Sequence, residues 1–62
     1  MKKLASSQMN TAFGEMLKFT LYRNGTMYDV HIQSDSEMHI LTLHLAELLS
    51  LKKLLNSLEV EE

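Results

Sequence analysis

Apolar and polar residues alternate over residues 17–33, which is the pattern of β-strands with one buried face. The dipeptide Asn24-Gly25 lies near the middle of this segment and tolerates the positive φ angles of a tight turn. The alternation and the dipeptide together predict a β-hairpin over residues 17–33.

The turn also predicts the register of this hairpin. With Asn24 and Gly25 as its two central residues, three apolar cross-strand pairs share one face. A shift by one residue would send these apolar side chains to opposite faces, so the turn and the alternation agree on one register. The expected pairs are Leu21 with Tyr28, Phe19 with Val30 and Leu17 with Ile32.

Residues 36–58 are rich in leucine and contain neither glycine nor proline, which indicates a long α-helix. Ser34 and Glu37 match the S-x-x-E capping box that often begins a helix. Asp35 adds a second negative charge near the positive end of the helix dipole. We therefore expect a helix over residues 36–58, followed by a short acidic tail at residues 59–62.

Apolar side chains would cover more than half of the circumference of this helix, whereas a surface helix usually buries a stripe of about 100°. One side is expected to pack on the hairpin and the other on a second chain. Leu41, Leu48 and Leu55 recur every seven residues, as in a short coiled-coil seam. The alternative is that all the leucines pack on the chain's own sheet, although a small domain offers little sheet to cover. The expected partner or dimer interface comprises Leu41, Leu45, Leu48, Leu51, Leu55 and Leu58.

Residues 1–14 leave two alternatives open. Ala5, Met9, Ala12 and Phe13 fall on one helical face, and Gly14 would end a helix there. The remaining residues are poor helix formers without a clear cap, which favours a flexible arm.

These elements predict an α+β fold in a single small domain: a possible short N-terminal helix, a hairpin and a long C-terminal helix. A chain of 62 residues buries only about 60% of its unfolded surface and is marginal alone. Cysteine is absent, so disulfides cannot stabilise it, and oligomerisation is the remaining common solution. The open hairpin edges favour the same solution, and we expect a homodimer.

The charge and the hydropathy pattern limit the partners. A formal net charge of −2 argues against broad electrostatic binding to nucleic acid. No segment reaches the roughly 20 apolar residues that span a bilayer, and the basic start at Lys2 and Lys3 is followed by no apolar export segment. We expect a soluble cytoplasmic protein without a membrane partner.

The sequence offers little catalytic chemistry. His39 and His44 would lie about 140° apart on the expected helix, so they do not converge on a metal. His44 and Glu47 are better explained as an interface or solvated pair than as catalytic groups. We therefore expect no catalytic site, no metal, no cofactor and no enzymatic activity.

The favoured function is a small protein-interaction module, a regulator or inhibitor that acts as a homodimer and binds another protein. Its small size is also typical of bacterial and phage regulators. The alternative is a dimeric regulator that binds nucleic acid through the outer face of the hairpin, where a ribbon can enter a groove or stack on bases. The residues for that surface, or for a protein partner on the same face, are Lys18, Tyr22, Arg23 and His31.

Overall fold

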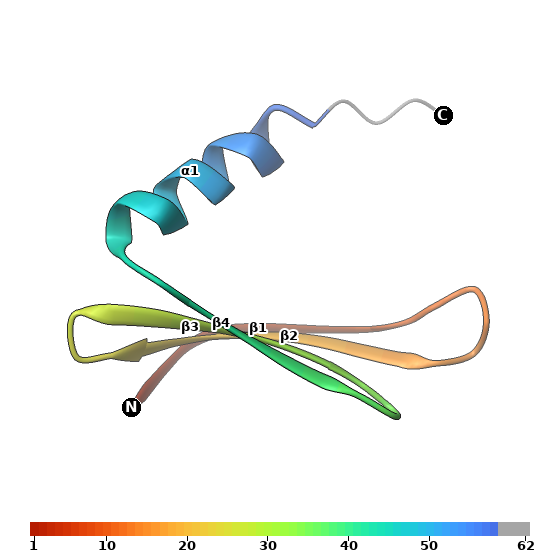
Figure 1. The fold of residues 1–62 in the computed structure, drawn as a ribbon. Helices are drawn as coiled ribbons and strands as arrows, with labels where there is room; N and C mark the ends of the chain where they lie inside the picture. The colour runs from red at the N-terminus through yellow and green to blue at the C-terminus, as the bar shows by residue number, and fades with distance from the viewer. Residues whose placement is uncertain (59–62) are drawn as a thin grey trace.

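The computed structural model describes residues 1–58, so the acidic tail expected at residues 59–62 lies outside the described residues. A four-stranded antiparallel sheet, with its strands in chain order, is followed by one α-helix on one side of the sheet (Figure 1). The α+β class is thereby confirmed. The elements are β1 (Lys2–Asn10), β2 (Met16–Asn24), β3 (Met27–Ser34), β4 (Met38–Leu43) and α1 (Leu45–Asn56).

The hairpin predicted over residues 17–33 is confirmed as β2 and β3, but its register is not the predicted one. Leu21 pairs with Val30 rather than with Tyr28, because the turn centres on Gly25 and Thr26. Gly25 has a φ of 64°, and no non-glycine residue in the described part of the chain has a positive φ. A type II′ turn needs a positive φ only at its first central residue, whereas type I′ needs it at both. The register moves by two residues, so the apolar side chains keep their predicted face, whereas Arg23, predicted on the outer face, lies on the same face as Leu21.

The first part of the predicted helix 36–58 is wrong, since residues 38–43 form β4. Ser34 and Glu37 close the β3–β4 turn instead of capping a helix: the Ser34 amide donates to the Glu37 carbonyl (2.8 Å). The Glu37 amide in turn donates to Ser34 Oγ (3.1 Å). Serine side chains stabilise turns by the same local bonds with which they cap helices. Ile40 and Thr42 are β-branched and suit a strand.

The helix begins later, at Leu45, and spans 12 residues. The Glu47 carboxylate accepts a hydrogen bond from the His44 backbone amide (2.9 Å), which satisfies one of the unpaired donors at the helix start. The predicted pairing of His44 with Glu47 is therefore a helix cap.

Residues 1–14 form neither the short helix nor the flexible arm that we expected. Lys2–Asn10 pairs with β2 as an antiparallel edge strand, with an irregularity between Lys3 and Ala5. Gly14, with a φ of 80°, belongs to the β1–β2 turn, in which its amide donates to the Thr11 carbonyl (3.0 Å). The glycine thus serves a turn and not a helix end.

The strand registers assign the side chains in the paired parts of the strands to one of two faces. We call the side covered by α1 the inner face and the opposite side the outer face. The inner face carries Ala5, Ser7, Met9, Leu17, Phe19, Leu21, Arg23, Tyr28, Val30, Ile32, Ser34, His39, Leu41 and Leu43. The outer face carries Lys3, Ser6, Gln8, Met16, Lys18, Thr20, Tyr22, Met27, Asp29, His31, Gln33, Met38, Ile40 and Thr42.

Residues 1–58 contain no buried apolar side chain. The two buried residues are polar, Thr20 (6% exposed) and Asp29 (7%), and both belong to the outer face. Thirteen large apolar side chains of these residues are at least 40% exposed, among them Phe13 (94%), Leu58 (70%) and Leu54 (66%). The single chain therefore folds into ordered layers without enclosing a hydrophobic core.

Candidate functional site

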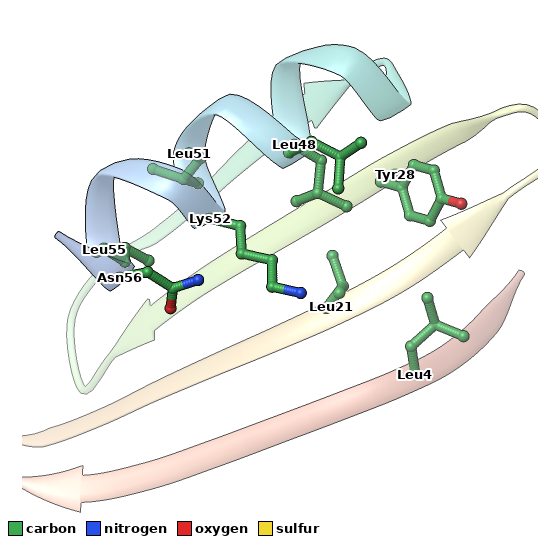
Figure 2. Close-up of a pocket in the computed structure, with 9 residues that line it drawn as sticks. Leu4, Leu21, Tyr28, Leu48, Leu51, Lys52, Leu55 and Asn56 are labelled. Atoms are coloured by element: carbon green, nitrogen blue, oxygen red, sulfur yellow. The ribbon is translucent and has the colours of Figure 1, made fainter.

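An open apolar groove of about 450 Å³ lies between α1 and the inner face of the sheet (Figure 2). Leu4, Leu21 and Tyr28 line it on the sheet side, and Leu4 and Leu21 point toward the helix. The helix side is lined by Leu48, Leu49, Leu51, Lys52, Leu55 and Asn56.

The groove stays open because α1 is held to the sheet mainly at its N-terminal end. Leu45 follows β4 after one residue, and the backbone of α1 approaches only β3 and β4. Leu48 and Leu51 are half-buried, while Leu55 remains 60% exposed. Water in such a groove finds few hydrogen-bond partners, and an empty groove forfeits dispersion contacts. Apolar side chains of another chain would fill it at the lowest cost.

Three of the six predicted interface leucines line this groove, namely Leu48, Leu51 and Leu55. The other three do not lie on its helix wall. Leu41 is on the inner face of β4, Leu45 is half-exposed at the helix start and Leu58 is 70% exposed beyond the helix end.

The seven-residue spacing is therefore not a seam on one helix, because Leu41 lies in a strand. The spacing of Leu48 and Leu55 remains within α1. A single chain does not test the association itself, which stays a prediction.

The inner face continues beyond α1 as a second, shallower hollow of about 200 Å³ over β1, β2 and β3. Ala5, Phe19 and Val30 are among its lining residues, and Phe19 is 40% exposed. The apolar surface is thus larger than the area that α1 overhangs.

The outer face gathers three of the four residues proposed for nucleic acid or a protein partner. Lys18, Tyr22 and His31 share it, and the rings of Tyr22 and His31 lie 4.6 Å apart at an interplanar angle of 52°. Arg23 lies apart on the inner face near the turn, where its Nε donates to the Gly25 carbonyl (3.4 Å). Lys3 lies opposite Tyr22 on the neighbouring strand and adds a cation to the face. This position of Lys3 could not be predicted from the sequence, because no apolar alternation marks β1 as a strand.

Asp29 is a buried carboxylate in the middle of this outer face. Thr42 Oγ1 donates to Asp29 Oδ1 (2.9 Å), and Asn24 Nδ2 donates to Asp29 Oδ2 (3.3 Å). One carboxylate therefore connects β3 with β4 and with the end of β2. It also places a negative charge among the cations of the face, which weakens the attraction for phosphate.

The remaining histidines do not belong to this cluster, because His39 lies on the inner face and His44 follows β4. His39 Nε2 lies 3.3 Å from Glu37 Oε2, and both side chains are exposed to solvent. His44 occupies the helix cap position. Within residues 1–58 no group of three histidine, aspartate or glutamate side chains is placed to hold a metal ion. The one helix described there is too short to cross a membrane.

Comparison with known proteins adds no functional information. The chain matches no known protein family, and no curated protein and no solved structure is significantly similar to it.

Proposed function

We propose that this chain is a small non-enzymatic interaction module that works as a homodimer and binds another protein as a regulator or inhibitor. The observation that carries the proposal is the lack of any buried apolar side chain in residues 1–58. Burial of apolar surface is the dominant favourable term in folding, and a chain that hides so little of it gains little stability alone.

The exposed area supports a partner of substantial size. Thirteen large apolar side chains of residues 1–58 are exposed. A standard protein interface buries about 800 Å² on each partner, and obligate dimers bury more. A second copy is the simplest partner, because a two-fold axis lets one surface meet its own copy and covers apolar side chains of both chains with one interface.

The first test is the mass of the protein in solution over a dilution series, by sedimentation equilibrium or by light scattering after size exclusion. We expect twice the 7.1 kDa of the chain, with a thermal midpoint that falls on dilution because folding and association are coupled. A folded monomer at every concentration would contradict the proposal.

A homodimer joined at an edge of the sheet would leave the outer face of each chain free for the regulated protein. Tyr22, His31 and Lys18 give it a polar surface with aromatic groups, and aromatic residues are enriched in protein interfaces. This surface is our candidate for the site that binds the regulated protein.

Nucleic acid is the second candidate ligand of the outer face, and the paired rings of Tyr22 and His31 favour it. Aromatic rings beside lysines can stack on unpaired bases while the cations contact phosphate. The net charge of −2 limits the affinity and makes a single strand a better ligand than a long duplex.

Fluorescence anisotropy with labelled single-stranded and duplex oligonucleotides at low salt tests this alternative. If it holds, Tyr22→Ala should weaken single-strand binding about 5- to 150-fold, corresponding to the 1–3 kcal/mol of a base-aromatic stack. Lys18→Ala should also weaken binding and reduce its salt dependence. The matched control is Lys53→Ala, which removes an exposed cation from α1. Failure of both probes to bind at low salt excludes nucleic acid.

A further inference from the structure

The two edges of the sheet differ sharply, and this difference indicates how two copies would join. The strand order places β1 at one edge and β4 at the other. An edge strand presents unpaired amide and carbonyl groups that can pair with another chain, so natural sheets protect their edges with charges, prolines or bulges.

The β1 edge carries such protection. Lys2 and Lys3 bring two positive charges to it, and the pairing is irregular between Lys3 and Ala5. Every residue of the strand is exposed, and serine, glutamine and asparagine make up most of its second half. Charges and a bulge are the features that prevent a second strand from pairing there.

The β4 edge carries none of this protection. Its sequence, MHILTL, contains no proline, lysine, arginine, aspartate or glutamate. Its register with β3 runs without a bulge from Met38 to Leu43. Three apolar side chains of the strand are about half-exposed: Met38 (51%), Ile40 (57%) and Leu41 (49%). An edge strand with a regular register, no lysine, arginine, aspartate or glutamate and three half-exposed apolar side chains is a site for strand addition.

We infer that β4 pairs with β4 of a second copy, in antiparallel orientation, to form one continuous sheet of two chains. The inference rests on the proposed homodimer and specifies its interface. A two-fold axis perpendicular to the sheet is the operation that makes the two strands antiparallel. The same axis keeps both inner faces, and therefore both helices, on one side of the joint sheet.

The joined sheet leaves the open groove outside the shared edge, because Leu4 of β1 lines the groove and β1 lies at the opposite edge of the sheet. Antiparallel strands end at opposite ends of their shared edge, so the two helices, which begin one residue after β4, start at opposite ends of it on the same side of the joint sheet. The half-exposed side chains of Ile40 and Leu41 from both copies lie along this edge.

Disulfide trapping tests the edge directly, since the natural chain contains no cysteine. Single variants His39→Cys, Ile40→Cys and Leu41→Cys scan β4, and Ser6→Cys on β1 is the matched control. Residues close to a two-fold axis between antiparallel strands meet their own copies at distances that a disulfide can bridge. We expect at least one β4 variant to form a covalent dimer on mild oxidation, and Ser6→Cys to remain monomeric on a denaturing gel.

Ile40→Lys provides the second test. A lysine at this position is solvated in the monomer, and a lysine on an edge strand disfavours its pairing with a second strand. We expect at least a tenfold rise in the dimer dissociation constant, with unchanged circular dichroism, while the control Ser6→Lys leaves it unchanged. If the wild type dimerises but no β4 cysteine is trapped and Ile40→Lys has no effect, the inference fails and the homodimer stands. Trapping through Ser6→Cys alone would likewise overturn it. A monomeric wild type would instead overturn the proposed function.

Discussion

Leu48→Ala is expected to convert the dimer into a monomer at concentrations at which the wild type remains fully associated. Leu48 lines the groove from α1 and points toward the strands (Figure 2). Truncating a fully buried leucine costs about 2–5 kcal/mol, and the half-buried Leu48 should lose about 1–2 kcal/mol per copy. Because folding and association are coupled and each dimer contains two copies of the change, the dissociation constant should rise about 30- to 1,000-fold. Sedimentation equilibrium measures it directly.

Helix content should survive this substitution, because alanine has the highest intrinsic helix propensity. Far-ultraviolet circular dichroism checks that association is lost before helicity. Leu55→Ala, at the other end of the same groove wall, should act in the same direction. Ser50→Ala is the control, since it lies about 160° around α1 from Leu48 and is exposed. Undiminished association in both leucine variants would contradict the role of the groove.

The hairpin could be predicted from the sequence because two independent signals coincide in it. Alternation assigns faces and the glycine assigns a turn, and both are local properties. The register was wrong by two residues since Asn24-Gly25 and Gly25-Thr26 are both acceptable turn centres. A two-residue shift preserves the faces, so the pattern of apolar residues does not distinguish these registers.

The boundary between β4 and α1 could not be predicted for a different reason. Leu41 and Leu43 fit a helix face and also fit alternation in a strand, and short apolar segments are ambiguous between the two. The S-x-x-E motif at Ser34 favoured a helix start, but Ser34 and Glu37 form a turn. Serine stabilises turns and helix starts by similar hydrogen bonds, so the motif does not distinguish them.

Strand β1 could not be predicted from the pattern of its side chains. All of its residues are exposed, so no apolar periodicity marks them. The strand is held by backbone hydrogen bonds to β2, which every residue other than proline can make. Because β1 could not be predicted, the position of Lys3 opposite Tyr22 could not be predicted either. The exposure of many leucine side chains could be predicted from composition alone, because a small chain cannot bury so many apolar groups.

Asp29→Ala is expected to cause the largest loss of stability among substitutions on the outer face. The substitution removes both acceptor oxygens and leaves Thr42 Oγ1 and Asn24 Nδ2 without their partner. A buried polar group deprived of its hydrogen bond costs about 1–3 kcal/mol. Asp29 is only 7% exposed, so solvent replaces the lost bonds poorly. Urea unfolding at a fixed protein concentration measures the change in free energy.

Two further variants separate the hydrogen bonds from the space that the side chain fills. Asp29→Asn retains the shape and one acceptor oxygen, so its loss should lie between those of the wild type and the alanine variant. In a double-mutant cycle, Asp29→Ala and Thr42→Val should show a coupling energy of about 0.5–3 kcal/mol. A coupling near zero would mean that the bond from Thr42 does not hold β4 in place. β4 is also the strand inferred to join two copies. If the bond from Thr42 holds β4 in place, Asp29→Ala and Thr42→Val should therefore also raise the dimer dissociation constant. A stability loss without that rise would separate the packing of β4 from its pairing across the dimer.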